Sequence, residues 1–400
     1  MTTVVLSPYD VARYSEGGGH FWVYLHYALG LQDIGCNVLW LESYVETGDR
    51  DDDRGKLRTL AERLKRHGLR NEPIFYPRST PSTLRSASGL FQRAELLINF
   101  EYAIHPDVLA WFRRTALVDI DPGMLQFWMA TGQLQVPHHD VHFTTGENIG
   151  APGGRVPDAG CRWHAIRPPV SLAAWPRATG PTHGAFTTIS SWWGGKGRGE
   201  WMVVDRENAF FENNKRTTFL ELADLPLLTT ETLELALSMD EQSILEAHVA
   251  LQGETAIPSR LREYASEAED CAFLLSRGWR IRTSREVSRT PDEYQRYIQQ
   301  SRGEFSCAKP AYVRFQNAWV SDRTLCYLAS GRPAVVQHTG PSTFLPDGEG
   351  LFRFRTLHDA ATALDAIQAH HERHCQAARA IAETCFDARK VVAGMLNVAL

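Results

Sequence analysis

The sequence lacks the features that mark disulfide-rich, secreted and membrane proteins. Its seven cysteines are scattered through 400 residues and form no C-x-x-C pair, a pattern typical of free thiols rather than of a disulfide framework or a zinc site. No run of about 18 apolar residues is long enough to span a membrane. The first ten residues, MTTVVLSPYD, contain neither the basic nor the long apolar region of a signal peptide. We therefore expect a cytoplasmic protein without a membrane span.

The chain also lacks an excess of positive charge and a recognisable metal-binding motif. Lys and Arg number 42 against 47 Asp and Glu, and the net charge of −5 argues against binding to nucleic acid through charge alone. Histidines and acidic residues gather in residues 138–150, HHDVHFTTGENIG, but their spacing matches no H-E-x-x-H or similar signature. The charged run at residues 49–54, DRDDDR, predicts a solvated loop. We expect neither a nucleic-acid partner nor a metal.

What the chain does contain is a repeated alternation of short apolar strands with helices, over a length that exceeds one hydrophobic core. Strands are predicted at residues 3–6, 38–41, 74–75, 96–100, 116–120, 140–145, 185–190, 233–237, 279–281 and 304–308. Helices are predicted at 21–34, 56–67, 106–113, 214–222, 240–249, 291–300, from 321 and from 357 onward, and a surface helical insertion without chemistry at 252–271. A stretch rich in Gly and Pro, 145–183, predicts loop and linker.

This βαβ rhythm predicts an α/β protein with two Rossmann-like, doubly wound domains that face a cleft. We place the first domain at residues 1–178 and the second at 179–385. A C-terminal helix, 386–400, is expected to pack back on the first domain. Ligands in such sheets bind beyond the carboxyl ends of the strands, so the cleft is the expected site.

The segment 304–340, EFSCAKPAYVRFQNAWVSDRTLCYLASGRPAVVQHTG, predicts a strand, a polar loop, a helix, a turn and a second strand. Ser321 is a good N-cap and Asp322 suits the first helical turn. The helix N-terminus points back toward the strand end, where its free N–H groups and dipole favour an anion. Lys309 and Arg323 add two cations near the same place. These features predict a seat for a pyrophosphate group.

A second glycine-bearing loop lies near the N-terminus, where Gly17, Gly18 and Gly19 precede a helix. Glycines in this position allow positive φ angles and a close approach of the backbone to a ligand. The loop does not match the G-x-G-x-x-G fingerprint of NAD-binding proteins, although Glu42 stands where a ribose-binding acid would stand. We therefore interpret the loop as part of a binding site that is not of the NAD type.

Two segments, GGGHFWVYLHYALGLQDIGCNVLWLE at 17–42 and EFSCAK…SDRTLCYLASGRPAVVQHTG at 304–340, together resemble bacterial GT-B fold glycosyltransferases that use nucleotide sugars. The resemblance implies a C-terminal domain that binds the nucleotide-diphosphate sugar and an N-terminal domain that binds the acceptor. It implies no cofactor beyond that co-substrate. Retaining members often carry two Glu seven residues apart, whereas Glu304 is followed by Tyr312 eight positions on. This departure favours an inverting reaction, which we also expect to be independent of a metal.

The resemblance also implies roles for individual residues. His20 would remove the proton from the acceptor hydroxyl, because its ordinary pKa suits general-base catalysis near pH 7. Asp121 would orient His20, and Glu147 would be an acceptor-binding or alternate base residue. Donor-binding residues would be Gly18, Gly19, Lys215, Arg282, Lys309, Ser321, Asp322 and Arg323. Lys215 and its neighbour Arg216 are alternatives as the cation that neutralises the leaving diphosphate.

Aromatic residues point to the acceptor side of the cleft. Trp192 and Trp193 are neighbours in a predicted strand, so their side chains must point to opposite faces and one of them can line the cleft. We assign acceptor binding to Trp192 and to His139. The many aromatic residues in the N-terminal half suit a small apolar acceptor, while a glycan acceptor stays open.

Three other functions compete with a glycosyltransferase. A nucleotide-sugar epimerase of the UDP-GlcNAc 2-epimerase type shares the fold and needs no acceptor. An NAD-dependent oxidoreductase is disfavoured by the missing fingerprint, and a non-catalytic nucleotide-sugar-binding protein would need no base. The sequence does not identify the sugar, the nucleotide, the acceptor or the oligomeric state.

Overall fold

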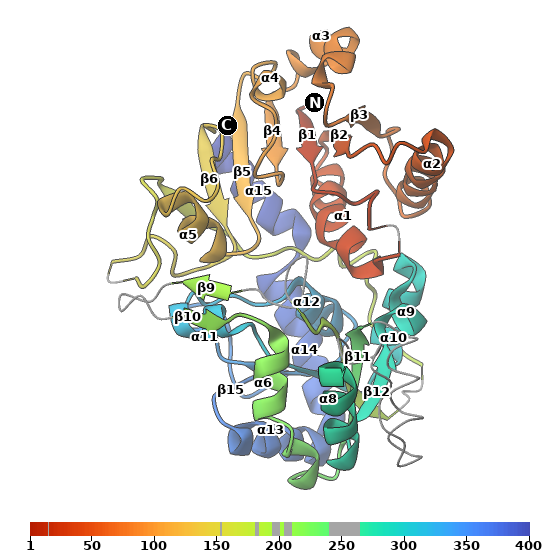
Figure 1. Ribbon diagram of the computed structural model, residues 1–400, viewed down its shortest axis with the longest axis vertical. Helices are drawn as coiled ribbons and strands as arrows, with labels where there is room; N and C mark the ends of the chain where they lie inside the picture. The colour runs from red at the N-terminus through yellow and green to blue at the C-terminus, as the bar shows by residue number, and fades with distance from the viewer. Residues whose placement is uncertain (15, 153, 181–183, 194–200, 204–209, 240–264) are drawn as a thin grey trace.

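A computed structural model describes residues 1–400 except 15, 153, 181–183, 194–200, 204–209 and 240–264. The described chain forms two α/β domains, one above the other in Figure 1, which confirms the predicted fold class. The predicted helix at 240–249 and most of the predicted insertion at 252–271 lie outside the described residues. No helix of the described ranges is long and apolar enough to cross a membrane.

The first domain is built on a seven-stranded parallel sheet in the order β3-β2-β1-β4-β5-β6-β7. Its strands are β1 (Thr3–Ser7), β2 (Asn37–Tyr44), β3 (Ile74–Pro77), β4 (Leu96–Asn99), β5 (Thr115–Asp119), β6 (Val141–Thr144) and β7 (Trp163–Ala165). The helices are α1 (Gly18–Asp33), α2 (Arg50–Arg66), the 3-10 helix η1 (Pro81–Ala87), α3 (Ser88–Phe91), α4 (Pro106–Leu109) and α5 (Met124–Ala130). β7 lies inside the stretch that the sequence predicts as loop and linker. Its three residues pair in parallel with β6 and form the edge strand of the sheet.

The second domain repeats this plan with a six-stranded sheet in the order β12-β11-β8-β13-β14-β15. The strands are β8 (Ala185–Ser191), β11 (Thr232–Ser238), β12 (Arg280–Thr283), β13 (Gly303–Ser306), β14 (Ala334–Gln337) and β15 (Leu351–Phe354), and β9 (Trp201–Val203) with β10 (Phe210–Glu212) forms a separate antiparallel pair. The helices are α6 (Lys215–Glu221), η2 (Leu225–Leu227), α8 (Ala265–Ser276), α9 (Ser284–Ser288), α10 (Pro291–Gln300), α11 (Pro310–Phe315), α12 (Asp322–Ala329), α13 (Leu357–Ala369), α14 (His371–Cys385) and α15 (Ala388–Ala399).

Local sequence signals explain where several helices begin. The Thr290 hydroxyl accepts from the Glu293 N–H, and the Glu293 side chain accepts from the Thr290 N–H, so α10 begins with a capping box. The prediction of a solvated loop at 49–54 is wrong. The Asp49 carboxylate accepts from two backbone N–H groups and begins α2, whose acidic first turn suits the helix dipole. The predicted polar loop after β13 contains the short helix α11.

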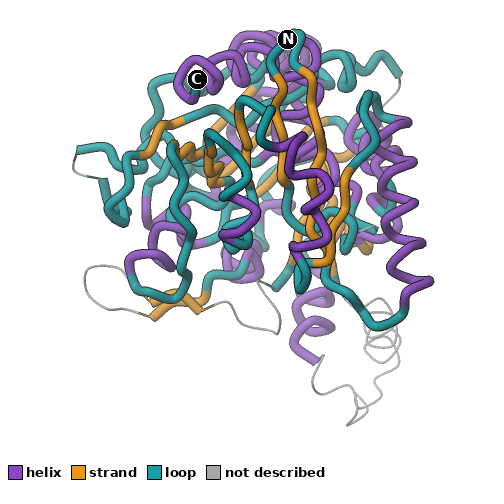
Figure 2. Tube along the Cα trace, turned by 90° about the horizontal axis from the view of Figure 1, so that it is seen from above, coloured by secondary structure: helices purple, strands orange, loops and turns teal. Residues whose placement is uncertain are grey.

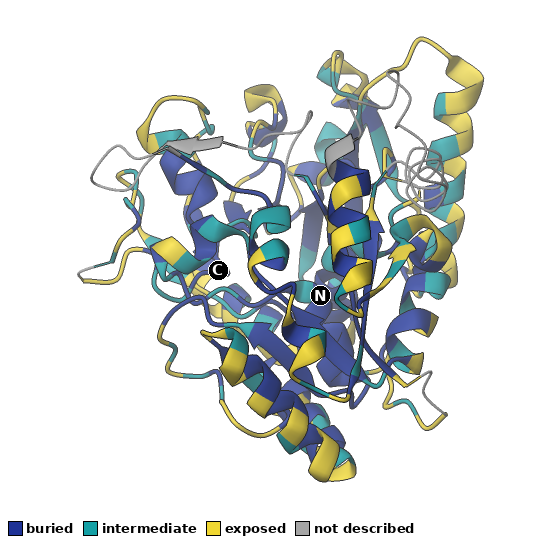
Figure 3. Cartoon of the chain, turned by 60° about the horizontal axis from the view of Figure 1, so that its bottom comes forward, coloured by how far each residue is buried: buried dark blue, intermediate teal, exposed yellow. Residues whose placement is uncertain are grey.

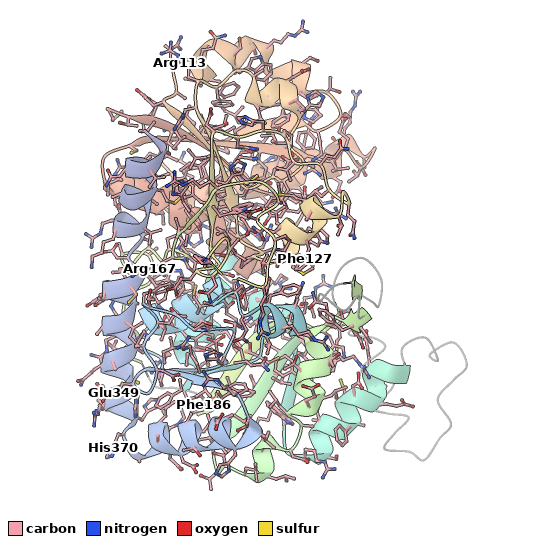
Figure 4. The ribbon with its side chains drawn as sticks, turned by 90° about the vertical axis from the view of Figure 1, so that its left-hand side faces the viewer. Arg113, Phe127, Arg167, Phe186, Glu349 and His370 are labelled. Carbon is pink, nitrogen blue, oxygen red and sulfur yellow. The ribbon has the colours of Figure 1, made fainter. Side chains whose placement is uncertain are left out.

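The C-terminal helices cross from the second domain to the first, as Figure 4 shows along one side of the molecule. A Cβ atom added to Gly30 of α1 would lie 2.8 Å from the Ala388 Cβ, so α15 packs directly on α1. The Val170 N–H donates to the Phe386 carbonyl, and the Ala388 N–H donates to the Val170 carbonyl. Two separate chain segments therefore run side by side where the domains connect.

The cores lie between the sheets and the helices that flank them. In Figure 2 the strands occupy the interior and helices surround them, and in Figure 3 the strands are buried while the outer helix faces are exposed. One cluster of buried side chains extends from Leu6 and Leu25 of the first domain to Leu325 and Leu351 of the second. The two domains therefore share apolar packing beside the cleft.

Candidate active site

The carboxyl ends of the two parallel sheets face each other across a cleft of about 970 Å³, which we call the central hollow. Each sheet reverses its strand order there, at β1/β4 in the first domain and at β8/β13 in the second. Such switch points are the usual ligand-binding places of open α/β sheets. The hollow is lined from both domains by Arg13, Tyr14, Glu16, Gly17, Gly19, His20, Val23, Lys56, Ile120, Ile189, Ser190, Ser191, Lys215, Ser238, Ser284, Ser288, Tyr294, Lys309, Tyr312, Trp319, Ser321, Asp322 and Arg323.

The N-terminus of α12 forms the floor of this hollow. The Ser321 hydroxyl accepts from the Arg323 N–H at 3.3 Å, as expected of an N-cap. Asp322 follows in the first turn, and burial raises the pKa of its carboxyl group. The structure thus brings together the helix start and the cations that the sequence predicts around it, because Lys309 and Arg323 line the same hollow.

Arg323 is held more firmly than the sequence indicates. Its Nε donates to Glu304 Oε1 at 2.8 Å and its Nη1 donates to the Ile189 carbonyl at 2.7 Å. Burial alone would lower the pKa of this guanidinium, but the Glu304 carboxylate and the nearby Tyr294 and Tyr327 together raise it. Glu304 also compensates the positive charge of Arg323, so the net cationic character of the hollow rests mainly on Lys215 and Lys309.

Lys215 begins α6 and lies opposite α12 in the central hollow. Burial, together with the positive charges of Arg323 and Lys309, lowers the pKa of its ammonium group to about 8. A lysine in this state gains most from an anionic ligand, because the ligand restores its charge. Arg216, the alternative that the sequence left open, instead donates to Asp270 at 2.5 Å and is not part of the hollow.

The glycines before α1 serve a different purpose from the predicted one. None of Gly17, Gly18 and Gly19 has a positive φ. A Cβ atom at Gly18 would lie 2.4 Å from the Thr290 carbonyl oxygen, and one at Gly19 would lie 2.9 Å from the Tyr294 ring. Gly17 and Gly19 line the hollow, whereas Gly18 packs against the other domain. The expected positive φ is therefore wrong, and close packing between the domains is the reason for glycine at Gly18.

Replacing Gly18 by Ala should accordingly lower stability. The added methyl group has to displace backbone at Thr290, and overpacking of this kind typically costs about 1–3 kcal/mol. We expect a lower midpoint in differential scanning calorimetry. Gly55→Ala is the matched control, since nothing lies within 4 Å of its Cβ position in α2. An unchanged midpoint for Gly18→Ala would contradict the packing described for α1.

His20 lies in the first turn of α1, between the rings of Tyr14 and Tyr24 at centroid distances of 5.0 and 5.1 Å. Its Nε2 is 2.7 Å from the Tyr9 carbonyl oxygen. A carbonyl only accepts hydrogen bonds, so neutral His20 carries its proton on Nε2 and has a lone pair on Nδ1. Burial lowers the pKa of the imidazole, while the Tyr9 carbonyl and the Asp10 charge oppose that shift. At neutral pH His20 is therefore an uncharged proton acceptor.

The predicted pairing of His20 with Asp121 is wrong. The Tyr312 hydroxyl donates a hydrogen bond to Asp121 across the cleft, and the Asp121 N–H donates to Asp119 Oδ1 at 2.9 Å. β5 delivers Asp121 to the cleft as expected, but the turn after the strand directs its carboxylate to the second domain. Burial raises the pKa of the Tyr312 hydroxyl, and the Asp121 charge raises it further, so the phenol keeps its proton.

A second hollow of about 590 Å³ opens beside His20 within the first domain. We call it the aromatic hollow. It is lined by Tyr9, His20, Tyr24, Phe100, Tyr102, Ala103, Ile120, Asp121, Trp128, Gln133 and Leu134. His20 and Ile120 line both this hollow and the central hollow, so the His20 side chain can contact a ligand in either one. A third hollow of about 900 Å³, the side hollow, includes Tyr9, Asp10, Arg78, Trp193 and Lys309.

Trp192 and His139, the predicted acceptor-binding residues, are both core residues. Trp192 is fully buried and stacks on Phe219 with ring centroids 6.1 Å apart. Both tryptophans come directly after β8, which ends at Ser191, so they are not neighbours in a strand as predicted. Trp193 lines the side hollow, and the assignment of acceptor binding to Trp192 is wrong. His139 is buried between Asn99 and the Pro137 carbonyl, and burial lowers its pKa to about 4.

Glu147 and Arg282 also lie elsewhere than expected. Glu147 accepts from the Ser342 hydroxyl and from the N–H of Thr343 at 2.8 Å, so it ties the two domains together at the rim and lines none of the three hollows. Arg282 is exposed and pairs with Glu286 at 3.0 Å. Ser284, the first residue of α9 directly after β12, lines the central hollow instead. A strand-end position does not by itself set the direction of a long side chain.

Sequence reasoning missed several lining residues. Tyr312 and Trp319 stack with centroids 4.4 Å apart on the wall of the central hollow, and Ser190 and Ser238 line the same hollow. The position of these two serines at strand ends is the sequence signal that could have identified them.

The domains also contact each other beside the site. The Phe127 and Phe315 ring centroids are 4.5 Å apart, and the Arg167 guanidinium lies over the Phe344 ring. Figure 4 places Phe127 and Arg167 where the two domains meet.

No group of three or more His, Cys, Asp and Glu side chains is arranged to hold a metal ion within the ranges that the structure describes. The expectation of metal-independent chemistry stays a prediction. Neither a protein-family model nor a curated protein sequence matches the chain significantly.

Solved structures, in contrast, resemble the whole chain. An alpha-glucosyltransferase in complex with UDP has a TM-score of 0.58 at 10% identity, with 100% of each chain covered. Sucrose-phosphate synthase from Thermosynechococcus elongatus has a TM-score of 0.57 at 12% identity, over 100% of this chain and 98% of that one. HepE from Anabaena in complex with UDP-glucose has a TM-score of 0.57 at 10% identity, with 100% of each chain covered. The chain therefore has the GT-B fold, which it shares with these three structures.

Proposed function

We propose that this protein is a glycosyltransferase that moves a sugar from a uridine-diphosphate sugar to a hydroxyl group of a small, largely apolar acceptor. The observation that carries the proposal is the position of His20, which lines both the cationic central hollow and the aromatic hollow. A neutral imidazole between an anion-binding place and an apolar pocket is what transfer from a sugar diphosphate to an alcohol requires.

The donor half of the proposal rests on the central hollow. Lys215, Lys309 and the start of α12 supply positive charge and free N–H groups for a diphosphate. Two of the similar solved structures hold UDP or UDP-glucose, which supports uridine as the nucleoside. No cofactor beyond the nucleotide sugar and no metal is part of the proposal.

The acceptor half rests on the aromatic hollow. Tyr24, Phe100, Tyr102 and Trp128 give it walls that favour a flat or apolar molecule, and its volume of about 590 Å³ is within the usual range for small-ligand sites. Asp121 and Gln133 provide polar groups that orient hydroxyls of such an acceptor.

The chemistry follows as an inverting displacement. His20 Nδ1 takes the proton of the acceptor hydroxyl while that oxygen forms a bond to the anomeric carbon. The bond between the anomeric carbon and the diphosphate oxygen breaks, and its electron pair leaves with the diphosphate. Lys215 and Lys309 offset the charge that develops on the leaving group. Closed domains around the cleft keep water from competing with the acceptor.

Nucleotide binding tests this proposal most directly. A thermal-shift comparison of UDP, GDP and TDP should show the largest stabilisation with UDP. Lys309→Ala should raise the Kd for UDP about tenfold and so reduce this stabilisation, as expected for the loss of a hydrogen bond to a charged group. The exposed Lys65→Ala serves as the control for loss of one positive charge. Stabilisation by none of the three nucleotides would refute the proposal, as would full stabilisation of Lys309→Ala.

A further inference from the structure

His20 receives its orientation from a backbone carbonyl rather than from a neighbouring acid. The Tyr9 oxygen at 2.7 Å holds the Nε2 proton and leaves Nδ1 as the basic atom. The carbonyl sets the tautomer, and its hydrogen bond also favours the protonated ring, so it opposes the lowering of the His20 pKa by burial. The loop that carries this carbonyl, residues 8–14 after β1, therefore influences how good a base His20 is.

Asp10, the next residue, is the exceptional member of this loop. It has a φ of 52°, in the left-handed region, and is 2% exposed. Asp and Asn are the residues other than glycine that adopt this conformation most readily. Its Oδ1 accepts from Arg78 Nη2 at 2.7 Å, and its Oδ2 lies 3.6 Å from Arg13 Nη1 and has no hydrogen-bond partner among the residues that the structure describes. Asp10 thus has a left-handed backbone and a buried carboxylate, and it directly follows Tyr9, whose carbonyl contacts His20.

Arg78 fixes this arrangement from the edge of the sheet, since it follows β3 directly. It donates to the Ser43 hydroxyl at 3.1 Å and pairs with Glu101 at 3.0 Å, and its guanidinium lies 5.6 Å from the centroid of the Tyr9 ring. One side chain therefore contacts both residues of the peptide that faces His20. Further along the loop, the Ala12 N–H donates to Glu42 Oε1 at 2.6 Å.

We propose that Asp10, held by Arg78 in a left-handed turn, is the positioning carboxylate of His20. It aims the Tyr9 carbonyl at Nε2 and stabilises the imidazolium that forms when Nδ1 accepts the acceptor's proton. This role rests on the proposed function of His20 as a base, and it replaces the role that the sequence assigned to Asp121. The negative charge of Asp10 favours the protonated imidazole, so it raises the pKa of His20 and opposes the lowering effect of burial.

Other groups around His20 do not offer the same interaction. The rings of Tyr14 and Tyr24 flank the imidazole edge to face, and burial raises the pKa of the Tyr24 hydroxyl. Asp121 lines the aromatic hollow, but its carboxylate binds the Tyr312 hydroxyl. Asp322 belongs to the first turn of α12 in the other domain, where Arg323 and Lys215 stabilise its charged form. Within the described residues, Asp10 is thus the acid tied most directly to the turn that contacts His20.

An NMR titration tests the assignment without using catalysis. The His20 signals in ¹⁵N-labelled protein are identified by their loss in His20→Gln, and their pKa is compared among Asp10→Asn, Asp121→Asn and Glu101→Gln. Asp10→Asn keeps the left-handed turn and an oxygen for Arg78, so the fold is preserved while the charge is lost. We expect it to lower the pKa of His20 by about one unit, the usual effect of losing an opposite charge nearby.

The control variants should behave differently. Glu101→Gln removes a buried charge from the far side of Arg78 and is expected to move the His20 titration much less. A shift in Asp121→Asn with none in Asp10→Asn would overturn the proposal. Asp10→Gly, which also tolerates the turn, provides the second variant, and an unshifted His20 in both Asp10 variants would refute the charge interaction.

Kinetics then separate the positioning role from the proposed function. In the transferase assay, Asp10→Asn should lower kcat by about tenfold with an unchanged KM for the donor, and the acid limb of kcat/KM should move to lower pH. A donor KM that rises with unchanged kcat would contradict the positioning role. If the NMR shift appears but no sugar transfer is found with any acceptor, the proposed function fails while the Asp10–His20 interaction stands.

Discussion

His20→Gln is expected to lower kcat by about 10²–10⁴-fold, the range that general-base catalysis contributes, while the Kd for UDP stays within about threefold of the original protein. The glutamine side chain fills similar space in the first turn of α1 but cannot accept a proton. Because His20 stands between the two hollows, its loss should affect the step that joins the two substrates rather than the binding of either one. Isothermal titration with UDP and a transfer assay measure the two quantities separately.

The pH profile adds a second readout to this variant. Burial lowers the pKa of His20 below its ordinary value of 6.5, so the imidazole of the original protein is a neutral base throughout the range above pH 6.5. The acid limb of kcat/KM should therefore lie below pH 6.5 and should vanish in His20→Gln. The exposed His138→Gln is the control, because it removes a histidine of the same domain outside the three hollows. An active His20→Gln with an intact acid limb would contradict the mechanism.

Lys215→Met should have the second largest effect, a loss of about 10²–10³-fold in kcat/KM, comparable to removal of one group that stabilises transition-state charge in other enzymes. Methionine preserves the length and apolar stem of the side chain but offers no charge to the diphosphate. The exposed Lys65→Met controls for the change in net charge. Unchanged kcat/KM in Lys215→Met would place the leaving group elsewhere.

The lowered pKa of Lys215 also predicts that nucleotide binding takes up protons. Without ligand, the ammonium group loses its proton as pH rises through about 8, and the diphosphate restores the proton by raising that pKa. UDP affinity should thus be constant below about pH 7 and should fall as pH rises past 8. Calorimetry at pH 8.5 in two buffers of different ionisation enthalpy measures the proton uptake, which Lys215→Met should abolish.

Much of the donor side could be predicted from local signals. An N-cap serine, an acidic first turn and a basic residue after a strand are short-range features, and the structure brings Lys309, Ser321 and Arg323 to one hollow as expected. These signals work because a helix start depends on the few residues that satisfy its free N–H groups. The pairing of Arg323 with Glu304 could not be predicted, since it joins α12 to β13 through the interior.

The acceptor side could be predicted only in part. Aromatic residues in the first domain and the position of His20 were visible in the chain. The choice between Trp192 and Trp193 depended on the packing of the segment after β8, where Trp192 stacks on Phe219 and Trp193 lines the side hollow. Glu147 and Arg282 lie near strand ends, but partners in other elements direct their side chains away from the hollows. Such directions are set by long-range contacts that spacing does not encode.

The sequence by itself determined the two Rossmann-like sheets, because the periods of apolar residues and the Gly and Ser signals at helix ends are local and repeat in both halves. Only the tertiary structure decided which groups meet in the cleft. The glycine at Gly18 permits contact between domains, and the partner of His20 is the Tyr9 carbonyl rather than Asp121. A backbone oxygen has no sequence signature, and its direction depends on a turn that a distant arginine stabilises.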